Sequence, residues 1–228
     1  MAIKIFSRTV ILLALAMGVH SEEPRDTPLT IGLIGDSTVA DTYGWGPAFA
    51  GRFKDGITVL NYARNGATLE SLSSRLDELV LLKPDYVLIQ FGHNDQKKYD
   101  TEVYGTRLKS YVDRIKRAGA TAVVLSSVTR RNFDENGKIK PVESGLKANL
   151  SYYASAARNV AKEEKVPFID LYAISVAHHN QLGAEASAAY NYNGVDTTHF
   201  SPAGAGATAG LILKELQAVI PELSGRLK

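Results

Sequence analysis

Short apolar runs alternate with stretches of helical periodicity from Leu29 almost to the end of the chain, and this alternation restricts the fold more than any other feature. The runs that we predict as strands are LTIGLIG (29–35), ITVLNYA (57–63), PDYVLIQFG (84–92), ATAVVLSSV (120–128) and VPFIDLY (166–172). Strands that are apolar on both faces are typical of a parallel sheet covered by helices on two sides. The pattern therefore predicts an α/β fold in three layers with a five-stranded parallel sheet.

The segments between these runs carry the periodicity of amphipathic helices. Helices are predicted within 45–53, 68–82, 102–119, about 146–164, from about Ile174, and over 201–220. Ser201 is the expected cap of the last helix, with Pro202 in its first turn. The polar stretch RRNFDENGKIKPVES (130–144) indicates a surface loop or a small hairpin. The segment YNYNGVDTTHF (190–200) is interpreted as a loop before the last helix.

The first 21 residues have the layout of a secretory signal peptide. Lys4 and Arg8 precede the apolar run VILLALAMGV (10–19), VHS follows with compact residues, and EEPRDTP (22–28) is abruptly polar. The run is shorter than the roughly 20 residues that a membrane span needs. We expect a signal peptide over 1–21, a short linker over 22–28, and a secreted or periplasmic protein without stable membrane insertion after cleavage. An uncleaved anchor helix is the alternative.

The composition fits one globular domain and excludes several kinds of site. The chain has 228 residues, of which 45% are hydrophobic, enough for a sizeable core. It has no cysteine, so a disulfide scaffold, a cysteine nucleophile and thiolate metal ligands are excluded. Lys plus Arg number 26 against 24 Asp plus Glu, and cleavage would remove Lys4 and Arg8 and leave 24 of each. No basic stripe then remains that would indicate nucleic acid as a partner.

Polar residues follow the ends of several predicted strands, and the carboxyl ends of parallel strands share the edge of a sheet where such folds bind ligands. Ser37 follows IGLIGD, and a serine needs a base to act as a nucleophile. His199 in DTTH can take its proton, with Asp196 fixing the imidazole tautomer, as in a Ser-His-Asp triad. Each residue also has a plainer interpretation: Ser37 as a helix cap, and His199 as a loop histidine bonded to a nearby aspartate.

Gly66 in ARNGAT and Asn94 in FGHNDQKK can supply the donors that a tetrahedral oxyanion requires. A glycine N–H and a carboxamide NH2 are both uncharged donors, and the N–H of Ser37 would complete the set. Gly66 can equally be a turn glycine, and Asn94 an ordinary loop amide. The weight of the prediction comes from coincidence, because four separate segments deliver suitable groups to one predicted edge.

With these residues in place, the chain resembles the SGNH hydrolases, whose four blocks carry Ser, Gly, Asn and His. The matching segments are GDSTVADTYGWG, NYARNGAT, FGHNDQKK and DTTHFSPAGA, which hold Ser37, Gly66, Asn94 and His199, with Asp196 alongside. Within the family the chain is most similar to the rhamnogalacturonan acetylesterase branch, through GDSTVAD followed by GWG, QFGHNDQK, RRNFDENGKI, FIDLYAIS and DTTHFS. The resemblance implies a flavodoxin-like hydrolase domain over 29–228. It also implies hydrolysis of acetyl esters on a polysaccharide through an acyl-enzyme, without a metal or other cofactor.

One departure from that branch concerns the sugar. After the second-block glycine, members of the branch often have an Arg-Ser pair, whereas this chain has Ala67 and Thr68. The oxyanion donor is a backbone group and is unaffected. Pectin, xylan and smaller acetylated sugars therefore all stay open as substrates.

Other residues near this edge have more than one interpretation. Asp36, His93 and His199 can be read as an oxygen–nitrogen metal site, which makes a metallophosphoesterase the rival enzyme; Asp36 is otherwise expected to make a structural hydrogen bond. The candidate substrate contacts are Tyr43, Trp45, Arg64, His93 and Tyr192, with Tyr190 nearby. Aromatic rings there can stack on a sugar or close the core under a loop. His178 and His179 are interpreted as solvated surface histidines.

Together these features predict an exported serine esterase that removes acetyl groups from plant cell-wall polysaccharide of the rhamnogalacturonan or pectin type. The alternatives within the family are a lipase or thioesterase and a xylan acetylesterase. A long-chain substrate needs an apolar trough, whereas the polar and aromatic segments at the predicted edge favour a sugar. From another class, a non-catalytic carbohydrate-binding protein would keep the fold and bind sugar without turnover.

Overall fold

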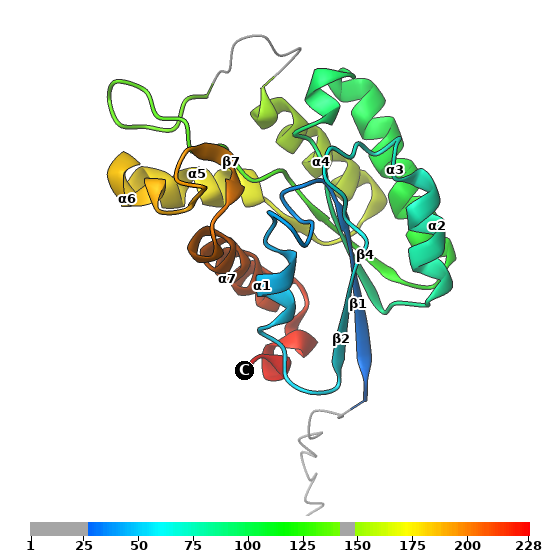
Figure 1. Cartoon of the computed structure of the whole chain (residues 1–228). Coiled ribbons are helices and arrows are strands. Elements are labelled where there is room, and N and C mark those ends of the chain that lie inside the picture. Colours follow the sequence, from blue (N-terminus) through cyan, green and yellow to red (C-terminus); the bar gives the residue numbers. More distant parts are fainter. Residues whose placement is uncertain (1–26, 142–148) are drawn as a thin grey trace, which may run out of the picture.

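A five-stranded parallel sheet in the order β2-β1-β3-β4-β5 forms the centre of the structure (Figure 1). The computed structural model describes residues 27–141 and 149–228, so the predicted signal peptide and most of the linker lie outside the described residues. The strands are β1 (Leu29–Gly35), β2 (Ile57–Asn61), β3 (Tyr86–Gln90), β4 (Thr121–Leu125) and β5 (Phe168–Ile169). The predicted α/β fold with five parallel strands is confirmed.

Helices cover both faces of the sheet, which produces three layers (Figure 1). They are α1 (Gly46–Ala50), α2 (Ser73–Leu81), α3 (Thr101–Arg117), α4 (Leu150–Glu164), α5 (Leu171–Leu182), α6 (Ala184–Ala188) and α7 (Pro202–Val219), with 3-10 helices η1 (Asp95–Lys97) and η2 (Pro221–Arg226). Helices α2, α3 and α4 pack on one face, and α1 and α7 on the other. Each face has its own buried cluster: Ile89 of β3 belongs to one and Leu88 to the other, because successive strand residues point to opposite sides.

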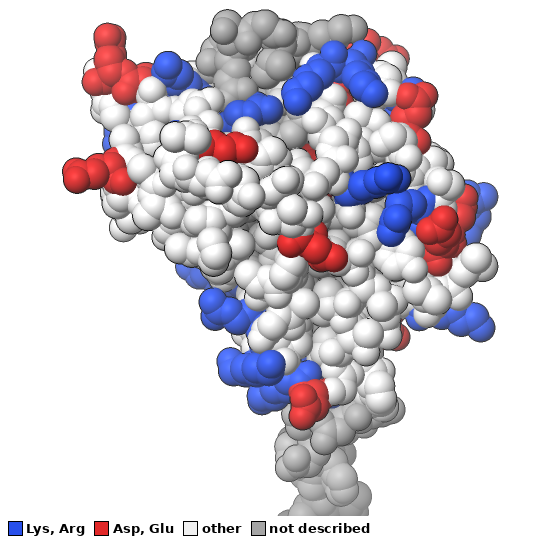
Figure 2. All heavy atoms as spheres, viewed as in Figure 1, with Lys and Arg blue, Asp and Glu red and all other residues white. Residues whose placement is uncertain are grey.

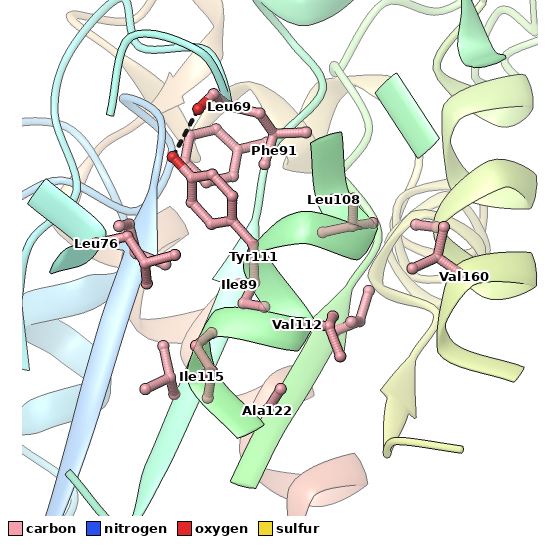
Figure 3. Packing of buried hydrophobic residues seen from close by; sticks show 14 of the residues in the cluster. Leu69, Leu76, Ile89, Phe91, Leu108, Tyr111, Val112, Ile115, Ala122 and Val160 are labelled. Carbon is pink, nitrogen blue, oxygen red and sulfur yellow. Dashed lines mark hydrogen bonds between the residues drawn. The ribbon is translucent and has the colours of Figure 1, made fainter. Parts of the chain in front are cut away.

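Helix α3 illustrates how the sequence specifies this packing. Its buried residues are Tyr104, Leu108, Tyr111, Val112 and Ile115, the set that helical spacing predicts. Figure 3 shows residues of this face beside Ile89 and Ala122 of the sheet. The Tyr111 hydroxyl donates to the Leu69 carbonyl at 2.6 Å, so the polar atom of a buried ring has a partner. That bond fixes α3 to the segment that leads from Gly66 into α2.

The register of the sheet determines where the chemically useful residues lie. Gly35 at the end of β1 pairs with Gln90 at the end of β3, and Gln90 pairs with Leu125 at the end of β4. Three neighbouring strands therefore end level with one another. The segments that follow them leave the sheet side by side, as the edge rule for open α/β sheets requires.

Several element boundaries differ from the prediction, most clearly those of β5, α5 and α4. Strand β5 has only two residues, because the Asp170 carboxylate caps α5 by accepting the main-chain N–H of Ala173 at 3.2 Å. Helix α5 therefore begins at Leu171 and not near Ile174. Helix α4 begins at Leu150, later than the predicted start near 146, with Asn149 in extended conformation before it.

The segment 190–200 is not the predicted loop but an antiparallel pair, β6 (Asn191–Tyr192) and β7 (Asp196–Phe200). Asn193 and Gly194 at its turn have φ values of 52° and 75°. Positive φ at both central residues is the requirement of the tight hairpin turn that Asn-Gly favours. Of the two structures predicted for 130–144, a surface loop or a small hairpin, the described residues up to 141 form the hairpin, closed by an antiparallel bridge between Phe133 and Ile139.

Charged side chains of both signs lie on the surface. Figure 2 shows Asp and Glu side chains interspersed with Lys and Arg over the face viewed. In the part of the chain that the structure describes, no helix combines the length and apolar character needed to cross a membrane.

Candidate active site

Ser37 lies in the turn that follows β1, with its main chain shaped by the residue before it. The Asp36 carboxylate accepts the main-chain N–H of Thr38 at 2.9 Å and the Thr38 hydroxyl at 2.7 Å. Asp36 is fully buried, and this burial raises its pKa although the bonds from Thr38 oppose the rise. The structural hydrogen bond expected of Asp36 is present. It holds the turn that presents the Ser37 hydroxyl, and Ser37 does not cap a helix.

His199 and Asp196 both lie in β7. His199 contacts Ser37, which is 162 positions earlier in the sequence. His199 Nε2 lies 2.8 Å from Ser37 Oγ, and His199 Nδ1 lies 2.7 Å from Asp196 Oδ2. Because a carboxylate can only accept, Nδ1 carries the hydrogen and Nε2 presents a lone pair to the serine. The three side chains thus form the hydrogen-bonded chain that a serine nucleophile with a general base requires.

Asp196 is held in place by its own strand. Its second oxygen accepts the main-chain N–H groups of Thr198 at 2.8 Å and His199 at 3.1 Å. Partial burial acts to raise the pKa of Asp196, but the hydrogen bonds from His199 and Thr198 outweigh it and lower that pKa. Asp196 is therefore a stable anion that orients the imidazole.

Asn94, which follows β3, binds the main chain of the residue after Gly66. Asn94 immediately precedes η1, and its Nδ2 donates to the Ala67 carbonyl at 3.1 Å, while Lys97 Nζ donates to its Oδ1 at 3.3 Å. One hydrogen of the carboxamide NH2 remains available to another acceptor. Gly66 has φ +73°, and a Cβ there would meet no atom within 4 Å, so backbone conformation and not space favours glycine.

Asp95, for which no role was predicted, also binds the segment that follows Gly66. It is buried, and its Oδ1 accepts the main-chain N–H of Leu69 at 3.0 Å. Burial raises the pKa of Asp95 to about 7; the Leu69 N–H opposes the rise and the nearby Asp36 adds to it. Asn94 and Asp95 together hold residues 66–69 against the end of β3.

Trp45 does not fit the sugar-stacking role considered for it. The ring is completely buried and packs against Phe49, with centroids 5.5 Å apart. Its Nε1 donates to Gln90 Oε1 at 2.8 Å, and Gln90 Nε2 donates to the Thr38 hydroxyl at 2.5 Å. Trp45 therefore closes the core and supports the turn that carries Ser37, which is the alternative that the sequence left open.

The burial of His93 does not favour the substrate contact considered for it. His93 is 2% exposed, and its Nε2 donates to the Val128 carbonyl at 2.9 Å. Burial, with the nearby positive charge of Arg130, lowers the pKa of His93 well below its ordinary value. The ring is a neutral structural neighbour of Asn94, because burial disfavours its charged form.

Tyr43 lies next to the imidazole of His199, and Tyr192 packs against Tyr43. The Tyr43 ring centroid is 4.8 Å from that of Tyr192 and 5.2 Å from that of His199, and the Tyr43 carbonyl accepts the N–H of Phe200 at 3.0 Å. Both rings are half-buried, so each keeps a surface that a sugar can meet. The Arg64 side chain is exposed, and its role as a substrate contact stays a prediction.

The paired histidines are not both at the surface. His178 is half-buried, whereas His179 is 2% exposed and its Nδ1 lies 3.0 Å from the Ser187 hydroxyl. Burial lowers the pKa of His179 to about 3, so it is neutral. The Tyr190 ring packs against both, at 5.9 Å and 5.7 Å, and so belongs to this cluster.

The rival metal site is not assembled by the described residues. Across 27–141 and 149–228, no three His, Asp or Glu side chains are grouped so that they could hold a metal ion. His93 turns its Nε2 to a carbonyl, and Asp36 binds Thr38.

Arg131 is the other residue that sequence analysis missed. It follows β4, is 3% exposed, and donates to the main chain of the strand that carries His199. The signal was available, because RRN leaves an apolar strand at the edge where GDS and GHND also leave theirs.

Residues 33–207 of the chain, which include Ser37, Gly66, Asn94 and His199, match the model of the GDSL-like lipase/acylhydrolase family. The chain belongs to the GDSL-like lipase/acylhydrolase family. It is accordingly a carboxylic ester hydrolase, as the sequence predicts. This GDSL family member resembles the rhamnogalacturonan acetylesterase RhgT of Bacillus subtilis (strain 168), with 37% identity over 216 residues that cover 83% of this chain and 90% of RhgT.

A fungal relative of the GDSL family member, the rhamnogalacturonan acetylesterase of Emericella nidulans, is 26% identical over 214 residues, or 84% of this chain and 86% of that protein. Among solved structures, the B. subtilis protein YxiM matches with a TM-score of 0.73 and 25% identity; the match covers 84% of this chain but only 57% of YxiM. The acetylxylan esterase Axe2 of Geobacillus stearothermophilus matches with a TM-score of 0.64 and 21% identity, over 83% and 94% of the two chains. These structures confirm the fold of the GDSL family member.

Proposed function

We propose that the chain is an exported serine acetylesterase that acts on plant cell-wall polysaccharide of the rhamnogalacturonan type. The observation that carries the proposal is the hydrogen-bonded chain from Asp196 through His199 to Ser37 at the edge of the sheet. The 37% identity to RhgT supports the substrate class. The basic and then apolar pattern of residues 1–21 supports export.

In the first half of the proposed reaction, Ser37 Oγ attacks the acetyl carbonyl while His199 Nε2 takes the hydroxyl proton. Asp196 stabilises the imidazolium that forms, because its carboxylate already accepts the Nδ1 hydrogen. The carbonyl oxygen becomes an oxyanion, for which the N–H groups of Ser37 and Gly66 and the free hydrogen of Asn94 Nδ2 are the proposed donors.

In the second half, the tetrahedral intermediate collapses and the C–O bond to the sugar breaks. The imidazolium gives its proton to the departing sugar oxygen, which leaves an acetyl ester on Ser37. Water then attacks that ester, with Nε2 as base again, and acetate leaves. Tyr43 and Tyr192 are the proposed contacts for the sugar ring, because Tyr43 lies at the imidazole, Tyr192 packs against Tyr43, and both rings are half-buried.

The test is acetate release by the wild type and by Ser37→Ala on acetylated rhamnogalacturonan, with acetylated homogalacturonan and acetylated xylan alongside. We expect rhamnogalacturonan to be preferred, and we expect kcat to fall by at least about 10³-fold in the variant because the nucleophile is lost. Ser155→Ala is the matched control, since that hydroxyl is on the exposed side of α4 and donates to the Ser151 carbonyl.

Each outcome has a separate meaning. Full activity of Ser37→Ala would show that the mechanism is wrong. Sugar binding by the wild type without acetate release would indicate the carbohydrate-binding alternative. Preference for acetylated xylan would overturn the substrate and keep the mechanism.

A further inference from the structure

Arg131 is a buried cation that contacts the hairpin carrying His199. It lies in the segment after β4, and 3% of its surface is exposed. Burial lowers the pKa of Arg131 to about 10, while the nearby Asp196 acts to raise it, so the guanidinium is charged at neutral pH. A charge taken out of water must recover its lost hydration from protein partners.

The partners of Arg131 belong to the hairpin. Its Nε donates to Asn191 Oδ1 at 2.6 Å. Its Nη2 donates to the His199 carbonyl at 2.5 Å and to the Asp196 carbonyl at 3.2 Å. Its main-chain N–H donates to the Thr197 carbonyl at 3.0 Å. These acceptors are all neutral oxygens, and the guanidinium lies 4.9 Å from the ring centroid of Phe200.

This arrangement links Arg131 to the reacting groups through the backbone. Asp196 and His199 are the two residues whose side chains continue to Ser37. Among residues 27–141 and 149–228, β7 pairs with the two-residue β6 and is not a strand of the five-stranded sheet, so the position of His199 depends on contacts other than pairing with that sheet. A planar guanidinium satisfies acceptors in two directions at fixed geometry, which a lysine ammonium does not reproduce.

We propose that Arg131 is a positioning residue for ester hydrolysis: its guanidinium fixes the main chain at Asp196 and His199 and so holds His199 Nε2 within reach of Ser37 Oγ. This rests on the proposed function, because it assumes that Ser37 and His199 react. Arg131 does not touch the substrate. It acts on kcat through the distance between base and nucleophile.

The test compares Arg131→Met, which keeps the length of the side chain without its donors, with Arg131→Lys, which keeps the charge. Assays with 4-nitrophenyl acetate are run well below the melting temperature of each variant. We expect kcat to fall about 100-fold in Arg131→Met, the loss that about 1 Å of misplacement produces, with KM within about threefold. Arg131→Lys should fall between Arg131→Met and the wild type. The rate of fluorophosphonate labelling of Ser37 should fall in parallel, because it also needs the base.

Arg226→Met is the matched control. Arg226 is also a buried arginine, but it lies in η2 and donates to the Thr27 carbonyl before β1, at the end of the sheet away from Ser37 (Figure 1). We expect this variant to lose stability and to keep the kcat and labelling rate of the wild type. A purely structural Arg131 would behave in the same way.

The inference is overturned if Arg131→Met keeps kcat within about twofold of the wild type, or if both methionine variants lower kcat equally. If Arg131→Met does not fold, Arg131→Lys decides: a fall in kcat and labelling of at least about tenfold supports the inference, and wild-type values overturn it. Activity retained by Ser37→Ala would instead be a failure of the proposed function. An inactive Ser37→Ala with a fully active Arg131→Met would refute the positioning role alone.

Discussion

Asp95 is a carboxyl group enclosed next to the proposed oxyanion donor. Asn94 is the predicted oxyanion donor of FGHNDQKK and His93 a candidate substrate contact or metal ligand, whereas no role is predicted for Asp95. Hydrogen-bonding residues that follow a strand look alike in sequence, and only the fold shows that Asp95 is fully buried while Asn94 is partly exposed. Residue identities at the edge were predictable, whereas the burial of each side chain was not.

The raised pKa of Asp95 makes stability depend on pH. The pKa of Asp95 in the folded protein, about 7, exceeds its ordinary value of 3.8. The stability that the buried, protonated Asp95 contributes is therefore complete below about pH 4 and is lost as the pH rises through 7. Asp95→Asn keeps an acceptor for Leu69 and cannot ionise. We expect the unfolding free energy of the variant, relative to wild type, to rise between pH 4 and pH 8 by up to about 4 kcal/mol, at about 1.4 kcal/mol per pKa unit.

Urea unfolding at several pH values measures this difference. Any effect of the substitution on the unfolding free energy that does not depend on pH cancels from it. Asp85→Asn is a control at an exposed carboxylate, which accepts the N–H of Thr30 at the other end of the sheet. Parallel stability curves for the wild type and Asp95→Asn would contradict the assignment.

At the scale of elements, the β6–β7 hairpin and α7 form one continuous unit around Ser201. The Ser201 hydroxyl accepts the N–H of Gly204 at 3.2 Å as the cap of α7 and donates to the Ala189 carbonyl at 2.7 Å. The cap was predicted, because serine before proline at the start of an apolar period is a strong local signal. The hairpin was missed although Asn193-Gly194 signalled it, because its strands are short and polar.

Ser201→Ala should destabilise the protein by about 1 kcal/mol, since one N–H at the start of α7 and one carbonyl lose their partner. Chemical denaturation measures the loss, with Ser155→Ala as the exposed control. Ser201 lies two residues after His199, but its hydroxyl bonds to Gly204 and Ala189 and not to Ser37. We therefore expect kcat of the folded variant to stay within about twofold of the wild type. A variant as stable as wild type would show that the cap is not formed.

At the scale of the whole molecule, the sheet, its strand number and its two helical layers followed from the sequence. Strands apolar on both faces require two coverings, and α3 buried the residues that its periodicity indicated. The segments holding Ser37 and Asn94 follow parallel strands that end level with one another, and hydrogen bonds join Asn94 to the Gly66 segment and His199 to Ser37. The partners of the supporting residues were not predictable, because Trp45, His93 and Arg131 bind groups that are distant in the chain.

The whole chain also carries the prediction of export. Expressed at full length in a bacterium, it should be recovered outside the cytoplasm with its N-terminus near Glu22, because Lys4, Arg8 and the apolar run are typical of a cleaved signal. N-terminal sequencing of the mature protein checks this. A variant with Lys4 and Arg8 changed to Glu should be exported more slowly, and recovery of an intact chain starting at Met1 would favour the anchor alternative.

Ser37 lies near one end of the chain and His199 near the other, so synthesis delivers the nucleophile first and the base last. A nascent chain that ends after β5 already contains every strand of the five-stranded sheet, and with it Ser37, Gly66 and Asn94. It still lacks the imidazole, which follows 162 positions after the serine. A chain that stops short of residue 199 therefore contains the proposed nucleophile without its proposed base, and it also lacks α7, whose Ala209, Ile212 and Leu216 belong to the buried cluster on one face of the sheet.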